Sequence, residues 1–156
     1  MPRRIKRPKI KDDNGNDKFK YLSEGENAIF NTMKDAFMLS ASIGFEMDEM
    51  GEWNKSYGQI PWSVFEEKDK DIINIIALAH TEDINIVSEQ NFDSKIEIIE
   101  EFAVAGFRIL YNEIIEKPGE PSENLEDFIE VSRGEDKELL DKAKKSLSDY
   151  SEDLFD

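Results

Sequence analysis

Apolar residues recur at helical spacing in three parts of the chain, and each part has a local signal for where a helix begins. Residues 23–44 start with Ser-x-x-Glu, the pattern of a capping box, in which two side chains satisfy free amides at the start of a helix. Residues 63–80 form the second part, and residues 94–117 begin with another capping box at Ser94. The pattern predicts three main helices.

The apolar faces of these helices make up the expected core. The first helix presents Ile29, Met33, Phe37 and Ser40 or Ala41, the second presents Phe65, Ile72, Ile75, Ile76 and Ala79, and the third presents Ile99, Phe102, Ala103, Gly106, Leu110 and Ile114. Gly44 is expected to end the first helix, and Pro118 with Gly119 to end the third. No run alternates as a strand does, so the sequence predicts an all-α protein, a compact bundle with shorter helices near its C-terminus.

Composition divides the chain into three regions. Residues 1–22 are predicted to be a basic arm, extended or flexible, because two prolines disfavour a helix there. Residues 23–118 form the predicted helical core domain. Residues 119–156 are predicted to be an acidic extension of short amphipathic helices that break at Gly134.

Charge is spread unevenly along the chain. The whole chain has 36 acidic residues, 20 Lys and Arg residues and a net charge of −16. Residues 1–11 carry six of the bases and no acid, so residues 12–156 keep 14 bases with all 36 acids, a net −22. A body of this charge is a poor general binder of nucleic acid or anionic lipid.

Two groups of residues are candidates for binding. The first is the basic arm, which could neutralise DNA phosphates without reading sequence, or equally could be a solubilising tail; its bases are Arg3, Arg4, Lys6, Arg7, Lys9 and Lys11. The second is an aromatic group around the start of the second helix, Trp53, Tyr57 and Trp62. Exposed aromatics anchor protein partners, but a lid folded over the core is the favoured interpretation, because large rings bury much area.

Residues suited to catalysis or metal binding are scarce in the sequence. The chain has no Cys and a single His, His80, which excludes thiolate chemistry and a zinc site built on several imidazoles. His80 is expected to pack or cap at a helix end. Glu97, Glu100 and Glu101 lie near one face of the third helix, where we expect them to form a solvated polar face. These features predict a protein that is not an enzyme and has no metal or cofactor.

Hydropathy sets the expected location. The apolar stretches are far shorter than the roughly 20 residues that a membrane-spanning helix needs. No apolar run follows the basic residues at the start of the chain, so the sequence predicts no secretory signal and a cytoplasmic protein without membrane contact.

Four stretches, in a fixed order, resemble a known family. They are KDAFMLSASIGF from Lys34, IPWSVF from Ile60, IIALA from Ile75 and EEFAVAGFRIL from Glu100. Their order and spacing are similar to those of the Dnd-system-associated proteins, specifically the small fourth family found beside DNA phosphorothioation genes. The resemblance runs from about Arg3 to Glu116 and is expected to leave out the acidic region that follows. It implies a role in a defence locus that marks DNA with phosphorothioate and restricts unmarked DNA, and it assigns no catalytic residue.

Three functional hypotheses follow. The first is a non-catalytic accessory protein of such an antiphage defence system, with other proteins of the same locus as partners and weak DNA contact through the arm. The second is an acidic decoy that imitates DNA and inhibits a nucleic-acid-binding protein, which the net −22 over residues 12–156 suggests. A metal-dependent nuclease or hydrolase built on carboxylates ranks last.

Overall fold

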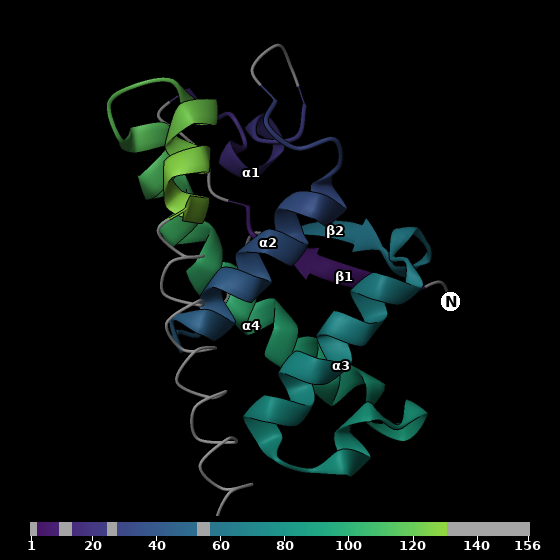
Figure 1. Ribbon diagram of the computed structural model, residues 1–156. Coiled ribbons are helices and arrows are strands. Elements are labelled where there is room, and N and C mark those ends of the chain that lie inside the picture. The colour runs from purple at the N-terminus through teal and green to yellow at the C-terminus, as the bar shows by residue number, and fades with distance from the viewer. Residues whose placement is uncertain (1–2, 10–13, 25–27, 53–56, 131–156) are drawn as a thin grey trace, which may run out of the picture. The chain divides into compact units, whose positions relative to one another are not determined.

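The computed structural model consists mainly of helices, with one small sheet (Figure 1). It describes residues 3–9, 14–24, 28–52 and 57–130. In chain order the elements are β1 (Arg4–Arg7), α1 (Lys18–Tyr21), α2 (Met33–Glu46), β2 (Gly58–Pro61), the 3-10 turn Trp62–Val64, α3 (Glu67–Thr81), the 3-10 turns Ile84–Val87 and Glu89–Asn91, α4 (Phe92–Tyr111) and the π-helix Asn112–Glu116.

Helices α2 and α4 cross so closely that their backbones touch, and this crossing forms the centre of the fold (Figure 1). Gly106 of α4 lies against the backbone of Ser40, and Gly44 of α2 lies against that of Phe102. A Cβ atom at Gly106 would lie 1.6 Å from the Ser40 carbonyl oxygen, and one at Gly44 would lie 2.1 Å from the Phe102 oxygen. Both distances are far below atomic contact, so only glycine fits at these two positions.

The first predicted helix is confirmed, but both of its predicted ends are wrong. Helix α2 starts well after Ser23, at Met33, because the Thr32 hydroxyl caps it by accepting a hydrogen bond from the Asp35 amide at 3.2 Å. Gly44 does not end the helix but lies inside it, where the absence of a side chain lets α4 approach.

The second predicted helix is confirmed as α3, with a later start and a different buried side. It begins at Glu67, and Ser63 lies in the preceding 3-10 turn. Ile76 is buried as predicted, but Ile72 and Ile75 are 40% and 63% exposed. The helix therefore turns part of its predicted core face toward solvent.

A buried ion pair explains how α3 is turned. The Lys34 ammonium of α2 lies 2.8 Å from an Asp69 carboxylate oxygen, and both side chains are buried. Burial opposes ionisation of Asp69, but the hydrogen bonds from Lys34 and the Glu66 amide, together with the charges of Lys34 and Lys68, outweigh it and keep the pKa of Asp69 below its ordinary value. Ile73 lies one turn after Asp69 and is buried beside it, which leaves Ile72 and Ile75 on the outer side.

The third predicted helix is confirmed most fully. Helix α4 begins at Phe92, slightly before the predicted start at Ser94. Every residue of its predicted core face is buried, both within α4 and in the π-helix that follows: Ile99, Phe102, Ala103, Gly106, Leu110 and Ile114. The strict spacing of three and four made this helix readable in the sequence.

The all-α prediction is correct for the dominant helices but misses a two-stranded antiparallel sheet. Strand β1 comes from the predicted arm and pairs with β2, so that Ile5 lies opposite Ile60 and Arg4 opposite Pro61. Ile5 and Ile60 are 1% and 2% exposed. This part of the predicted arm is a strand docked on the core, and Lys18–Tyr21 of the same arm form the short helix α1.

The chain divides into two compact units, Met1–Asn112 and Glu113–Asp156, and the second is described as far as residue 130. It turns at Gly119, whose φ of +118° favours glycine, and continues as a helix over 121–130. The buried Asn124 amide donates hydrogen bonds to the carbonyls of Ile114 and Lys117 at 3.0 and 3.2 Å. The helix break predicted at Gly134 lies outside the described residues.

The crossing of α2 and α4 can be tested by giving one glycine a side chain. We expect Gly106→Ala to lower the free energy of unfolding by about 2–4 kcal/mol, because the added methyl group forces the two backbones apart. Urea unfolding followed by circular dichroism measures this change. Arg108→Ala, at an exposed position of the same helix, is the control and should change stability by no more than about 0.5 kcal/mol. Equal effects of the two substitutions would rule out a tight crossing.

Candidate functional site

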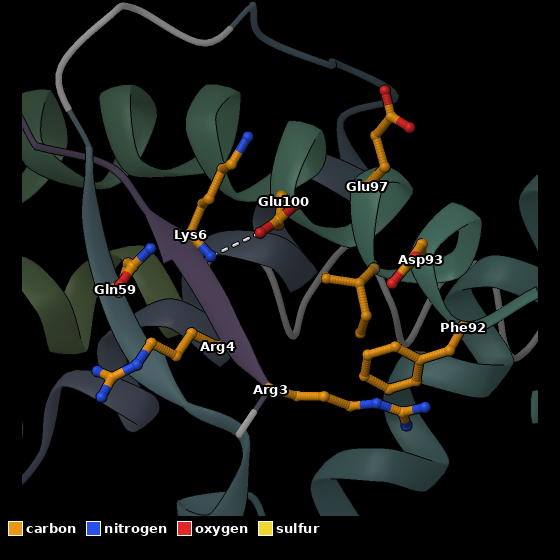
Figure 2. A pocket seen from close by; sticks show the side chains of 9 residues that line it. Arg3, Arg4, Lys6, Gln59, Phe92, Asp93, Glu97 and Glu100 are labelled. Carbon is orange, nitrogen blue, oxygen red and sulfur yellow. Dashed lines mark hydrogen bonds between the residues drawn. The ribbon is translucent and has the colours of Figure 1, made fainter. Parts of the chain in front are cut away.

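A pocket of about 490 Å³ lies between strand β1 and the first half of α4, and its two walls carry opposite charges (Figure 2). The strand side contributes Arg3, Arg4 and Lys6, with Gln59 from β2, and the helix side contributes Phe92, Asp93, Ile96, Glu97 and Glu100. We call this pocket the strand–helix groove. It is the concave site that the structure builds from the arm.

The alternation of β1 decides which arm residues face the groove. Successive side chains of a strand point to opposite faces. Ile5 and Arg7 are buried on one face, whereas the side chains of Arg4 and Lys6 lie on the other, and both of these residues line the groove along the edge of β1 opposite β2. Figure 2 shows the Lys6 side chain extending from β1 beside α4. Alternate residues of β1 therefore have two roles: Ile5 and Arg7 anchor the strand, and Arg4 and Lys6 place positive charge beside the groove.

Glu100 fixes the strand to the helix. Its carboxylate accepts a hydrogen bond from the backbone amide of Lys6 at 2.5 Å, shown as a dashed line in Figure 2. The side chain of Glu100 is buried, so the expected solvated face of α4 is wrong at this residue. Burial raises the pKa of Glu100 to about 7, although the amide of Lys6 acts in the opposite direction.

The two neighbouring acids differ from Glu100. Glu97 is exposed, as expected, and Glu101 is half-buried. Burial and the charge of Glu97 raise the pKa of Glu101, and His80 lowers it. His80 lies in the last turn of α3 and packs edge-on against the Phe102 ring, with ring centres 5.2 Å apart. This placement agrees with the packing role predicted for His80.

Arg7 belongs to the core. Its buried guanidinium forms an ion pair with Asp17 at 2.7 Å and donates to the Pro8 carbonyl at 3.0 Å. It also lies against Gly58, where a Cβ atom would be 2.3 Å from the guanidinium carbon. Arg7 therefore does not face solvent with the other bases of the arm.

The remaining bases of the arm have different surroundings. Arg3 forms an ion pair with Glu89 and stacks on Phe92, with the guanidinium carbon 3.8 Å from the ring centre. Arg4 is exposed, and Lys6 and Lys9 are half-buried; the ammonium of Lys6 lies 4.8 Å from the centre of the Tyr57 ring. Lys11 lies outside the described residues. The prediction of DNA contact therefore rests on fewer free charges than the sequence suggested.

The two described members of the predicted aromatic group, Tyr57 and Trp62, have different surroundings. Trp62 is half-buried and packs against the rings of Phe65 and Phe92, with centres 5.0 and 5.1 Å away. This packing agrees with the lid interpretation for Trp62. Tyr57 is 39% exposed beside the groove, and Trp53 lies outside the described residues. A partner-binding role for Tyr57 stays a prediction.

Comparison with known proteins gives the family. The family described as DNA sulphur modification system-associated protein 4 matches residues 4–149. The chain belongs to this family. The match confirms the resemblance of the four sequence stretches, but it also includes most of the acidic region after Gly119, which was expected to lie outside the similarity. No curated protein and no solved structure matches the chain.

The part of this DNA sulphur modification-associated protein that the structure describes has neither a membrane-spanning helix nor a metal-binding cluster. None of the helices in this part of the chain is long and apolar enough to cross a membrane. Within the same ranges, no three His, Asp or Glu side chains gather where they could hold a metal ion.

The buried carboxylate gives this family member a specific pH dependence. Because the pKa of Glu100 is about 7 in the folded state against an ordinary 4.5, the folded state holds the proton more tightly than the unfolded state. Its contribution to stability is complete below pH 4.5 and is lost as the pH rises through 7. The free energy of unfolding of Glu100→Gln should therefore rise relative to that of the parent protein as the pH increases from 4.5 to 7. Urea unfolding of both proteins at pH 4, 5, 6, 7 and 8 measures the difference, and a difference independent of pH would contradict a raised pKa.

Proposed function

We propose that this protein is a non-catalytic accessory component of a defence and restriction system linked to DNA sulphur modification. It acts in the cytoplasm by binding another protein of the same locus. The family supplies the association with DNA sulphur modification. The structural support for protein contact is the outer side of α3.

Helix α3 carries apolar side chains on a side that the core does not cover. Ile72 and Ile75 are 40% and 63% exposed, and Ala79 is exposed one turn further along. Positions separated by three and four residues lie on one face of a helix, so these side chains form a single stripe. We call it the α3 stripe. Apolar side chains grouped on a surface favour burial against a partner protein.

Helix α3 is anchored to the core, so the α3 stripe is rigid. The inward side of α3 is held by the ion pair between Lys34 and Asp69 and by three buried residues, Ile73, Ile76 and Ala77. A rigid helix loses little conformational freedom on binding. The α3 stripe is therefore suited to a stable contact with an apolar patch on a partner.

A non-catalytic role agrees with the chemistry of the most perturbed acid. Glu100 has a pKa raised to about 7, the kind of shift that also occurs in active sites. Its carboxylate, however, accepts the backbone amide of Lys6 and so connects two elements of the fold. This structural role explains why Glu100 is buried without invoking a catalytic role.

The α3 stripe can be tested by co-expression with the products of the DNA sulphur modification genes. We expect one of them to form a stoichiometric complex with this protein, measured by size-exclusion chromatography with light scattering. The double substitution Ile72→Asp and Ile75→Asp should weaken that complex at least tenfold, because it places charge where apolar contact is needed.

Met50→Asp is the matched control, since Met50 is 39% exposed and lies outside α3. Circular dichroism confirms that each variant is folded. Failure to form a complex with any product of the locus would overturn the proposal, as would a complex that both variants weaken equally. A complex that duplex DNA dissolves would favour the acidic-decoy alternative instead.

DNA contact through the arm is expected to be weak. Ion pairs occupy Arg3 and Arg7, so the described candidates between residues 3 and 11 that remain are Arg4, Lys6 and Lys9. Three phosphate contacts give a slope of about −3 for the logarithm of the binding constant against the logarithm of salt concentration. Fluorescence anisotropy with a labelled duplex between 50 and 200 mM salt measures the slope. A slope steeper than about −6 would show that other charges bind DNA.

A further inference from the structure

Strand β1 has one paired edge and one edge that faces the strand–helix groove. In an antiparallel pair, alternate residues direct both backbone polar groups toward the partner strand. The Trp62 amide bonds to the Arg3 carbonyl, and this register assigns Ile5 and Arg7 to the edge that faces β2. The backbone groups of Arg4 and Lys6 consequently face the opposite edge. Pro61, which has no amide hydrogen, is opposite Arg4, where β2 needs no donor toward β1.

Glu100 occupies one hydrogen-bonding position of this edge. Its carboxylate oxygen takes the Lys6 amide at 2.5 Å, in the place where a carbonyl oxygen of a third strand would lie. The next edge-facing donor along β1 is the Arg4 amide, and the next acceptors are the carbonyls of Arg4 and Lys6. The described residues provide no further strand for these groups. The edge thus has the polar pattern that strand addition requires.

The groove beside this edge has the size and lining for a short extended segment. Its 490 Å³ lie along Arg4 and Lys6, a length that a strand covers with about three residues at about 3.3 Å each. Phe92 and Ile96 of α4 provide apolar contact on the helix side, which also carries the acids Asp93, Glu97 and Glu100. Arg4 and Lys6 provide positive charge on the strand side, where side chains of an added strand would be their cross-strand neighbours.

We propose that the strand–helix groove binds an extended acidic–apolar–acidic segment of a partner protein, added to β1 as a third, antiparallel strand. The two acidic residues lie opposite Arg4 and Lys6, and the apolar residue between them points toward Phe92 and Ile96. Cross-strand neighbours of opposite charge are stabilising, and the intervening side chain points to the other face. The occupant is a protein segment, since only a backbone supplies donors and acceptors at the spacing of the edge.

Glu100 controls the last hydrogen bond of this complex. When the segment is fully paired, its carbonyl replaces the Glu100 carboxylate on the Lys6 amide. The released carboxylate either reaches water or, if it stays buried, takes up a proton, because burial raises its pKa and the Lys6 amide no longer lowers it. Arg4 can pair before this exchange, so the segment begins binding at Arg4 and completes it at Lys6.

The test uses a defined probe, the fluorescein-labelled peptide Glu-Ile-Glu-Ile-Glu with blocked ends, and measures its dissociation constant by fluorescence anisotropy. We expect saturable binding, and at least tenfold weaker binding of the matched peptide Lys-Ile-Lys-Ile-Lys. Methylation of the Glu backbone nitrogens should abolish binding, because these nitrogens face β1. Methylation of the Ile nitrogens should leave binding within about threefold, since these face away from β1.

A pair of variants separates the backbone of Arg4 from its charge. Arg4→Ala removes the charge and keeps the edge-facing amide, whereas Arg4→Pro removes both. Neither change touches a hydrogen bond between β1 and β2. We expect Arg4→Pro to bind the acidic peptide about fivefold more weakly than Arg4→Ala, the effect of one net hydrogen bond. If Arg4→Pro does not fold, the methylated peptides on the parent protein decide the question.

The inference is overturned if the acidic peptide does not bind, if methylation at either set of nitrogens has the same effect, or if a 12-base-pair duplex displaces the peptide stoichiometrically. The last result would assign the groove to phosphate instead of to a strand.

The inference does not depend on the α3 stripe. The peptide can bind this chain even if no protein of the locus forms a complex through α3, and a complex lost with Ile72→Asp and Ile75→Asp can exist even if the peptide fails.

Discussion

The strand–helix groove depends on a contact between a buried carboxylate and a backbone amide. Glu100 holds the Lys6 amide, and this contact brings a strand from the start of the chain onto a helix that begins more than eighty residues later. Leaving such a carboxylate buried without a partner is costly, and leaving a strand amide without an acceptor is costly too. The contact satisfies both groups and positions Arg4 and Lys6 along the groove.

Helix α4 can hold the strand because its own position is fixed from the other side. The crossing of Gly44 and Gly106 brings α2 and α4 together at backbone distance, and the ion pair between Lys34 and Asp69 connects α2 to α3. Close backbone packing leaves few alternative arrangements. The groove beside β1 and the stripe on α3 are therefore presented by one rigid set of helices.

Sequence patterns predicted the three helices and the buried face of α4, because strict helical spacing is a strong signal. They could not predict the sheet, since the four residues of β1 contain one apolar side chain, Ile5. Glycine commonly ends helices, and the sequence alone does not show that α4 packs against Gly44. A signal for the groove was present but weak: Glu100 stands at helical spacing between Ile96 and Ala103, both buried, which places an acid in line with the core.

The central claim is that the start of the chain is a docked strand with one edge open to the groove. Native-state hydrogen exchange of its four amides, followed by NMR, tests the claim most directly. We predict slow exchange at Ile5 and Arg7, which face β2, and at Lys6, which Glu100 holds, with fast exchange at Arg4 alone. Exchange of all four amides at the rate of an unstructured peptide would show that the strand is not docked and would contradict the account.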